Sequence, residues 1–277
     1  MVGKRIIIFG GAGSIGSELT RQLAKKNKIF IVDIDETRTY DLREELRWKG
    51  HWVHSMTGDI RNTYHVYDVF SDFKPEIVIQ AAALKHVEPC EEYPDEAYNT
   101  NLIGTMNVYN EAKKWNIKKF IFISTDKVTD DISIMGNSKS AAETFIRNRG
   151  RRNGKTVVVR FGNVMNSRGS VLEIWKRQFE NKEPLTITHP DMERYMMSIP
   201  QACELVIEAG KKGNKGELWI MDMGKPIKII DLKEQIYGKK YPIKIIGLRK
   251  GERMSEKLMT LDEEKRAAKK DKFWIIP

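Results

Sequence analysis

A glycine-rich turn near the start of the chain constrains its fold more than any other feature. The apolar run Ile6–Phe9 leads into Gly10-Gly11-Ala12-Gly13-Ser14-Ile15-Gly16, after which Ile15 and Leu19 fall at helical spacing. A turn of this kind between a strand and a helix gathers free backbone amides where the helix dipole favours negative charge. The segment, with Ser14 and Ile15 between its last glycines, therefore predicts a dinucleotide site in a Rossmann-type sheet.

Three of these glycines have separate tasks in such a site. Gly10 allows the tight turn, Gly13 lets a pyrophosphate approach the backbone, and Gly16 lets the helix pack closely on the strand. Asp33 ends the next apolar run and is suited to accept hydrogen bonds from the adenosine ribose hydroxyls, which favours NAD. Asp33 would repel a 2′-phosphate, so NADP is disfavoured, although Arg38 lies close in sequence.

Further apolar runs alternate with helical segments along the first part of the chain. They are rich in β-branched residues and are not interrupted by polar ones: Ile29–Val32, Ile77–Ile79, Phe120–Ile123 and Val157–Val159. Continuous runs of this kind are typical of strands covered by helices on both faces. The predicted fold is therefore α/β, a Rossmann-type doubly wound parallel sheet.

Past about residue 163 the regular alternation of apolar runs and helical segments ends, and prolines separate shorter elements. We predict a NAD-binding domain over residues 1–162 and a smaller C-terminal substrate-binding lobe over residues 163–277, with segments interleaved with the main sheet. The charged tail Leu261–Lys272 is expected to form a solvated helix in which Glu263 and Glu264 face lysines.

Composition excludes several classes of protein. The 277 residues are 40% hydrophobic, which suffices for a full core and argues against a disordered chain. The 2 cysteines lie far apart, so neither a disulfide scaffold nor a metal site is predicted. No apolar stretch approaches the roughly 20 residues that span a bilayer, which predicts a cytoplasmic protein without membrane insertion. The net charge of +10 is scattered among acidic residues and indicates a solvated surface rather than nucleic-acid binding.

A second group of polar residues follows the apolar run Phe120–Ile123. Ser124-Thr125-Asp126-Lys127 stands at the carboxyl end of this run, where ligands bind in parallel sheets. Met135-Gly136-Asn137-Ser138-Lys139 comes next along the chain. A surface ion pair is the alternative interpretation of Asp126 and Lys127.

Taken together, these segments resemble the extended branch of the short-chain dehydrogenase/reductase superfamily. The spacing GxxGxxG is joined by Gly58-Asp59-Ile60, by Ala81-Ala82-Ala83 and by Asn101-Leu102-Ile103-Gly104-Thr105. The resemblance implies that Asp59, with Ile60 beside it, holds the adenine and that Ala81, Ala82 and Ala83 let the cofactor pass. Most dehydrogenases of this superfamily carry Tyr where this chain has Met135, which cannot transfer a proton.

Within the superfamily, Ser-Thr-Asp-Lys followed by Met-Gly-x-x-Lys resembles the capsule and O-antigen nucleotide-sugar 4,6-dehydratases. With Met135 in the position of the Tyr, the chain resembles the configuration-retaining UDP-N-acetylglucosamine 4,6-dehydratases of this family. The implied reaction oxidises the sugar at C4, eliminates water across C5 and C6, and returns the hydride to C6. Lys127 is then the C5 base and needs to be neutral, Asp126 is the acid for the C6 oxygen, and Thr125 hydrogen-bonds the C4 oxygen. Lys139 would hold the nicotinamide ribose. Whether Asp126, Lys127 or a water removes the C4 hydroxyl proton stays open.

The resemblance also implies a UDP-sugar pocket, because a diphosphate needs cations and a ribose needs polar partners. The residues implied are Arg194 and Arg249 for the diphosphate, Asn163 near the sugar, Glu252 for the ribose hydroxyls, and Lys85 with His86 on the sugar side. A structural role at a helix start is an equal alternative for His86. A homo-oligomer is expected by resemblance.

Two other functions stay open. A UDP-sugar 4-epimerase shares the fold, the cofactor and hydride abstraction at C4, but usually keeps the Tyr and lacks the Asp126–Lys127 pair. A catalytically silent NAD-binding sensor is the other, supported by Met135, and it would tolerate the loss of Lys127.

Overall fold

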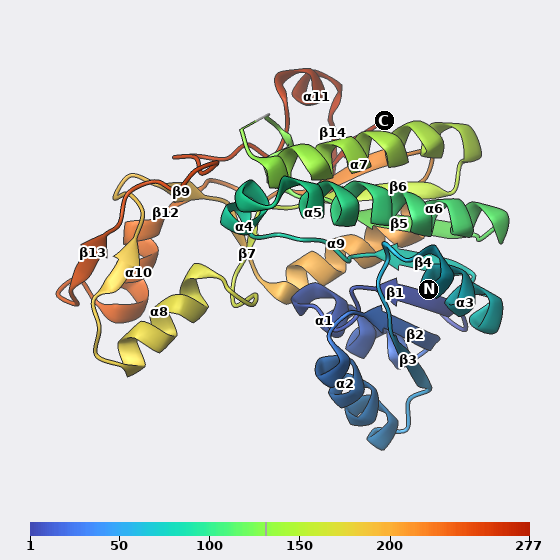
Figure 1. Ribbon diagram of the computed structural model, residues 1–277. Helices are drawn as coiled ribbons and strands as arrows, with labels where there is room; N and C mark the ends of the chain where they lie inside the picture. Colours follow the sequence, from blue (N-terminus) through green and yellow to red (C-terminus); the bar gives the residue numbers. More distant parts are fainter. Residues whose placement is uncertain (131) are drawn as a thin grey trace.

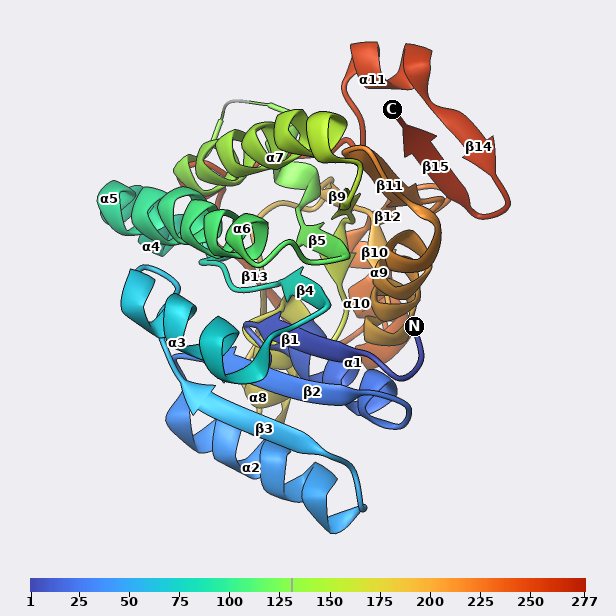
Figure 2. The same ribbon diagram turned by 90° about the vertical axis from the view of Figure 1, so that its right-hand side faces the viewer.

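A nine-stranded sheet forms the centre of the computed structural model, which describes residues 1–130 and 132–277. The strand order is β14-β15-β11-β6-β5-β4-β1-β2-β3. The seven strands from β11 to β3 in this order are parallel, whereas β15 pairs antiparallel with β11, and β14 antiparallel with β15. The prediction of an α/β, doubly wound sheet is confirmed, with an antiparallel edge added to it (Figure 2).

The elements of this sheet and of its covering layers are mostly those expected from the apolar runs. The strands are β1 (Arg5–Phe9), β2 (Lys28–Asp33), β3 (Val53–Thr57), β4 (Ile77–Gln80), β5 (Lys119–Ile123), β6 (Thr156–Arg160), β11 (Glu217–Met221), β14 (Ala268–Lys270) and β15 (Phe273–Ile276). The helices are α1 (Ser14–Ala24), α2 (Glu36–Trp48), α3 (Thr63–Phe73), α4 (Val87–Glu92), α5 (Pro94–Tyr98), the π-helical η1 (Asn99–Gly104), α6 (Thr105–Lys114), the 3₁₀ turn η2 (Asp126–Val128), α7 (Ile134–Asn153) and α9 (Ile199–Lys212). Among the described residues, no helix is both long enough and apolar enough to cross a membrane.

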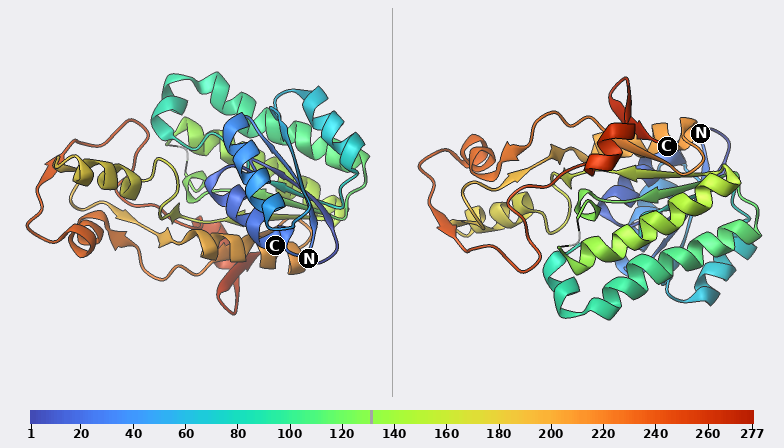
Figure 3. Two further views of the ribbon diagram at one scale, coloured as in Figure 1. Left: turned by 90° about the horizontal axis from the view of Figure 1, so that it is seen from below. Right: turned by 90° about the horizontal axis from the view of Figure 1, so that it is seen from above.

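Alternate residues of each parallel strand point to opposite faces of the sheet. In β1, Ile6 and Ile8 pack in the layer of α1, α2 and α9, while Ile7 and Phe9 pack in the layer of α3, α6 and α7. All four side chains are fully buried. Because helices cover both faces (Figures 2 and 3), the strands need apolar residues at every position, which explains the continuous runs.

A smaller lobe stands beside the sheet, at one end of it (Figure 1). It contains α8 (Val171–Glu180), α10 (Ile229–Tyr237) and three short strand pairs: β7 (Asn163–Val164) with β10 (Met196–Met197), β9 (Glu193–Arg194) with β12 (Ile227–Lys228), and β8 (Leu185–Ile187) with β13 (Ile243–Ile245). The lobe has its own apolar core, in which Trp175 is fully buried against Leu185, Ile187 and Leu232.

The chain passes between the lobe and the sheet more than once. Helix α9 and strand β11 belong to the sheet and its covering layer, although they follow the first lobe segments. After β13 the chain returns through α11 (Leu261–Arg266) to β14 and β15. The boundary at residue 163 stays a prediction, while the sheet includes three strands from beyond it.

The charged tail is not the solvated helix that its composition suggests. Helix α11 ends at Arg266, and the chain then forms strand β14. Glu263 is buried and accepts hydrogen bonds from Arg147 and Arg160, which stand 116 and 103 residues earlier in the chain. A local count of charges cannot reveal these partners, because they reach Glu263 only through the tertiary fold.

Candidate functional site

The glycine turn joins β1 to α1 in the predicted manner. Gly10 has a φ of 75°, and a Cβ there would lie 2.6 Å from the backbone nitrogen of Ala82. A Cβ at Gly16 would lie 2.0 Å from the Gly10 carbonyl oxygen, so no side chain fits. Gly13 caps the helix without a side chain, and Ser14 and its successors begin it. Because the first N–H groups of a helix have no partner within it, this turn can bind a diphosphate.

Asp33 ends β2 next to the glycine turn. Its Oδ2 accepts a hydrogen bond from the Ala12 N–H at 3.0 Å, and its Oδ1 accepts one from the Asp35 N–H at 3.2 Å. Each carboxylate oxygen can still accept a further bond from a ribose hydroxyl. Arg38, in the first turn of α2, lies 3.0 Å from Asp35 Oδ2, so its charge is already paired.

The other residues expected near the cofactor follow neighbouring strands of the sheet. Ala81–Ala83 come after β4, and Asp59 comes after β3 with Arg61 only 2.7 Å from its Oδ2. Burial alone would raise the pKa of Asp59, but the hydrogen bonds from Arg61 outweigh it and lower that pKa. Ile60 is buried, and a Cβ at Gly104 would lie 2.6 Å from its side chain. This close contact explains the glycine in η1.

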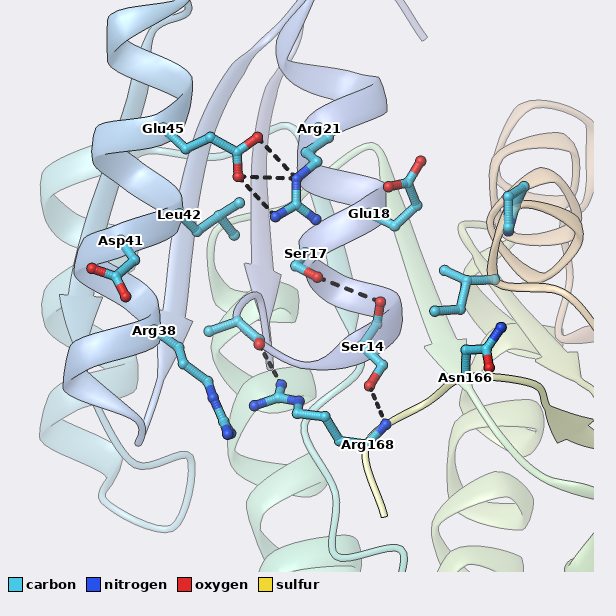
Figure 4. A pocket seen from close by; sticks show the side chains of 13 residues that line it. Ser14, Ser17, Glu18, Arg21, Arg38, Asp41, Leu42, Glu45, Asn166 and Arg168 are labelled. Carbon is cyan, nitrogen blue, oxygen red and sulfur yellow. Dashed lines mark hydrogen bonds and ion pairs between the residues drawn. The ribbon is translucent and has the colours of Figure 1, made fainter. Parts of the chain in front are cut away.

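A cavity of about 750 Å³ opens beside the glycine turn, between α1 and α2 (Figure 4). Ser14 and Ser17 line it from α1, Arg38 from α2, and Arg168 from the lobe. The Arg168 N–H donates to Ser14 Oγ at 3.0 Å, and its guanidinium donates to the Ala12 carbonyl. No role for Arg168 follows from the sequence, because only the tertiary fold brings the lobe to this turn.

Three of the predicted catalytic residues follow β5: Thr125 caps η2, and Asp126 and Lys127 lie in it. Thr125 Oγ1 accepts from the Lys127 N–H at 3.4 Å and donates to Asp126 Oδ1 at 3.0 Å. The Lys127 ammonium lies 3.1 Å from the same Asp126 oxygen. Asp126 is only 1% exposed, so the two residues do not form the solvated surface pair that was the alternative interpretation.

Glu256, from the segment between β13 and α11, completes this cluster. Its Oε1 lies 2.9 Å from Lys127 Nζ and 3.4 Å from Arg194 Nε. Its Oε2 accepts a hydrogen bond from Asn163 Nδ2 at 2.9 Å. Glu256 is buried, and its neighbours come from three other segments of the chain. No local pattern in the sequence marks it as part of the site.

The three ionisable groups Asp126, Lys127 and Glu256 of this cluster have shifted pKa values, and not in the same direction. Burial raises the pKa of Asp126 to about 7, with Glu256 adding to the rise and Lys127 opposing it. Burial opposes ionisation of Glu256, but Lys127 and Arg194 outweigh it and lower the pKa of Glu256 to about 2. Burial also disfavours the Lys127 ammonium, yet Asp126 and Glu256 raise the pKa of Lys127 above its ordinary value. The raised pKa of Asp126 fits the expected proton donor. The raised pKa of Lys127 does not fit the expected neutral base, because two carboxyl groups face this ammonium.

The two named residues of α7 lie in different surroundings. Lys139 is buried, donates to the Ile123 carbonyl at 2.6 Å, and lies 4.2 Å from the centre of the Phe122 ring. Burial lowers the pKa of Lys139 to about 7. Met135 is 3% exposed and packs in an apolar cluster with Cys90 and Ala97. Its thioether therefore fills space in the place where most relatives of the superfamily carry a Tyr.

The six residues expected around a UDP-sugar are not equally available. Arg194 is buried, and its guanidinium donates to the carbonyls of Arg253 at 2.7 Å and of Glu193 at 2.8 Å. It therefore holds the segment that carries Glu256, a task its sequence context did not predict. Arg249 is exposed, and its N–H donates to Glu252 Oε2 at 3.2 Å.

Lys85 and His86 lie where the Rossmann part meets the lobe. The Lys85 ammonium donates to the Arg168 carbonyl and lies 3.5 Å from Ser167 Oγ. His86 precedes α4 at its N-cap position but makes no side-chain cap, and its ring lies against Gly169. Asn163 bonds Glu256, as described above. Loop 165–170 of the lobe thus contacts both the glycine turn, expected to bind the cofactor, and Lys85 and His86, expected to lie near the sugar.

Comparison with known proteins gives consistent matches along the whole chain. The profile of the polysaccharide biosynthesis protein family matches residues 6–277. The capsular polysaccharide biosynthesis protein CapD of Staphylococcus aureus is 41% identical over 276 residues, which cover 95% of this chain and 46% of CapD. This chain therefore spans about half the length of that relative. A UDP-glucose 4-epimerase of Rickettsia bellii is 35% identical over 290 residues, covering 100% of this chain and 83% of the epimerase.

Solved structures agree with the fold. Pen from Bacillus thuringiensis has a TM-score of 0.92 at 35% identity, covering 100% of this chain and 88% of that chain. The dTDP-glucose 4,6-dehydratase DesIV from Streptomyces venezuelae, solved with NAD bound, has a TM-score of 0.80 at 17% identity, covering 94% and 90% of the two chains. At that identity, the likeness to DesIV supports the fold alone.

Proposed function

Since the chain belongs to the polysaccharide biosynthesis protein family of extended short-chain dehydrogenases/reductases, we propose that it is an NAD-dependent nucleotide-sugar 4,6-dehydratase. The proposed substrate is a UDP-N-acetylhexosamine, with UDP-N-acetylglucosamine first among them. The product is the UDP-4-keto-6-deoxy sugar and one water. The observation that carries this proposal is the buried Asp126, whose pKa is raised to about 7, beside the Lys127 ammonium at 3.1 Å.

The dinucleotide would lie along the carboxyl edge of the sheet. Gly10, Gly13 and Gly16 would face its diphosphate, and Asp33 would accept hydrogen bonds from its adenosine ribose. No amino-acid side chain accepts a hydride, and a bound nicotinamide would supply the hydride chemistry that the reaction needs at C4 and C6. Lys139, buried beneath this edge, would hold the nicotinamide ribose.

The elimination would fall to Asp126 and Lys127. The elimination needs a base that removes the proton from C5 and an acid that protonates the departing hydroxyl on the neighbouring C6. Asp126 has the raised pKa of an acid that still carries its proton near neutral pH. Lys127 can act as the base only after it loses its own proton. Its side chain is 23% exposed, which gives water access to the ammonium.

A UDP-sugar 4-epimerase is the second candidate, favoured by the similarity that covers all of this chain and 83% of the Rickettsia epimerase. Epimerisation needs no acid for a C6 hydroxyl, so it would use the buried Asp126–Lys127–Glu256 cluster for the C4 hydroxyl proton alone. It also conserves the mass of the sugar, whereas dehydration does not.

Mass spectrometry of UDP-N-acetylglucosamine incubated with the protein and NAD⁺ tests the proposal. We expect the loss of one water, no accumulation of NADH, and no reaction with Lys127→Ala. Lys257→Ala is a matched control, because Lys257 is exposed and forms no ion pair among the described residues. An unchanged mass with a changed NMR spectrum of the sugar would assign the epimerase instead. Retention of full activity by Lys127→Ala would refute the assigned base.

A further inference from the structure

We propose that Arg168 is a cofactor-positioning residue, which the lobe contributes to the dinucleotide site and which holds the dinucleotide's diphosphate against the glycine turn. This inference rests on the proposed use of NAD, but it adds a residue to which neither the family resemblance nor the comparisons give a role. It also gives the lobe a part in cofactor binding, in addition to its expected part in sugar binding.

The first argument is the charge of the glycine turn. Residues 10–16 contain no Lys or Arg, so the turn offers a diphosphate only backbone amides and the Ser14 hydroxyl. A diphosphate carries two negative charges, and guanidinium groups bind such oxygens with charge-assisted hydrogen bonds. A cation from elsewhere in the fold is therefore expected at this turn.

The second argument is the position of the Arg168 guanidinium. It donates to the carbonyl of Ala12, inside the turn, and a Cβ placed on Gly13 would lie 3.9 Å from its Nη2 (Figure 4). The Arg168 backbone is also tied to the turn, because its N–H donates to Ser14 Oγ at 3.0 Å. Main chain and side chain of one lobe residue thus both contact the segment that would face the diphosphate.

The third argument is that this guanidinium has donors to spare. Among the described residues it makes one hydrogen bond and one ion pair, the latter at 4.0 Å with Asp35, which already pairs with Arg38 at 3.0 Å. An arginine has five N–H donors, so most of those of Arg168 remain for a ligand. Its side chain is 34% exposed, which leaves it free to turn toward one.

The fourth argument is the closeness of two basic residues, Arg168 and Lys85, at loop 165–170, where Glu173 offsets their charges only in part. The Lys85 ammonium donates to the Arg168 carbonyl, and burial together with the Arg168 charge lowers the pKa of Lys85. Burial and the charge of Lys85 in turn lower the pKa of His86. An anion bound to Arg168 would relieve the repulsion between the Arg168 and Lys85 charges.

Equilibrium binding of NAD⁺, NADP⁺, ADP-ribose and adenosine to the full chain tests this proposal by titration calorimetry. The variants are Arg168→Gln, Arg168→Lys and the control Arg177→Gln. Arg177 is exposed on α8, the helix that follows loop 165–170, and forms no ion pair among the described residues. We expect Arg168→Gln to weaken NAD⁺ and ADP-ribose about 10- to 100-fold, the effect of losing one charged hydrogen bond. Adenosine, which has no phosphate, should bind as to the wild type, and Arg168→Lys should recover part of the affinity.

Equal affinities of the wild type and Arg168→Gln for NAD⁺ would overturn the proposal. An equal loss for adenosine would also overturn it, because that result assigns Arg168 a structural role in holding lobe and turn together. A loss confined to NADP⁺ would assign it to a 2′-phosphate instead. Failure of the wild type to bind any dinucleotide would refute the proposed function itself, and this is measured before the variants are compared.

Discussion

Arg147, Arg160, Glu143 and Glu263 form a buried ion-pair cluster, which allows a stability prediction that does not depend on function. Glu263 accepts bidentate hydrogen bonds from Arg160, at 2.7 and 3.0 Å, and lies 3.3 Å from Arg147 Nη1. Glu143 is the second carboxylate of the cluster, so two arginines face two glutamates. Glu263→Gln removes one negative charge from a balanced buried set while keeping the size of the side chain.

The expected loss of stability follows from the uncompensated arginine. Removing one partner of a buried ion pair destabilises a protein by about 3–5 kcal/mol, and we expect the lower end because Gln can still accept a hydrogen bond. For a chain of this size, a loss of about 3 kcal/mol lowers the melting temperature by about 6–12 °C. Differential scanning calorimetry at pH 7 measures this shift. Glu264→Gln, the exposed neighbour in the same helix, should change it by no more than about 1–2 °C.

The pH dependence provides a second check of the same reasoning. Burial opposes ionisation of Glu263, but Arg160 holds its pKa below the ordinary value of 4.5. Its contribution to stability is therefore fully present above about pH 4.5 and is lost as the pH falls through the lower pKa of the folded state. The difference between wild type and Glu263→Gln should shrink in that acidic range. Equal melting temperatures of Glu263→Gln and Glu264→Gln at pH 7 would refute the reasoning.

Two further predictions concern the site. Glu256→Gln removes an anion that raises the pKa of Asp126, so that pKa should fall below about 7 and the loss of the proposed dehydratase activity at alkaline pH should begin at lower pH. A pH–rate profile identical to that of Glu264→Gln would contradict this role of Glu256. Gly16→Ala places a Cβ 2.0 Å from the Gly10 carbonyl, which distorts the turn and should weaken NAD⁺ binding by at least about tenfold. Titration of the folded variant measures this effect, and an unchanged affinity would exclude the glycine turn as the diphosphate site.

The Rossmann part of the fold was predictable because its determinants are local. The run Ile6–Phe9, the glycine turn and Asp33 stand within about one strand–helix–strand unit, where residue spacing alone fixes the geometry. The same holds for Thr125, Asp126 and Lys127, which follow a strand directly and occupy one short turn. Each of these predictions needed only the periodicity of a strand or helix and the direction of the parallel sheet.

The parts that were not predictable depend on contacts between distant segments. Glu256 reaches Lys127 from the segment after β13, and Arg168 reaches Ala12 from the lobe, 156 residues further along the chain. The raised pKa of Lys127 departs from the expected neutral lysine partly for the same reason, because the remote Glu256 adds to the effect of the adjacent Asp126. Glu263 looked like a surface residue, since its local neighbours are charged while its actual partners are remote.

The return of the chain to the sheet determines how this protein can be divided or recombined. Strands β11, β14 and β15 come from beyond residue 163, so a fragment ending at residue 162 would leave the apolar edge of β6 without its partner and prone to association. The lobe is an insertion in two pieces, one on each side of α9 and β11. A chimera that exchanges the lobe with that of a relative therefore needs four junctions rather than one, and these are best placed around residues 163, 198, 222 and 260.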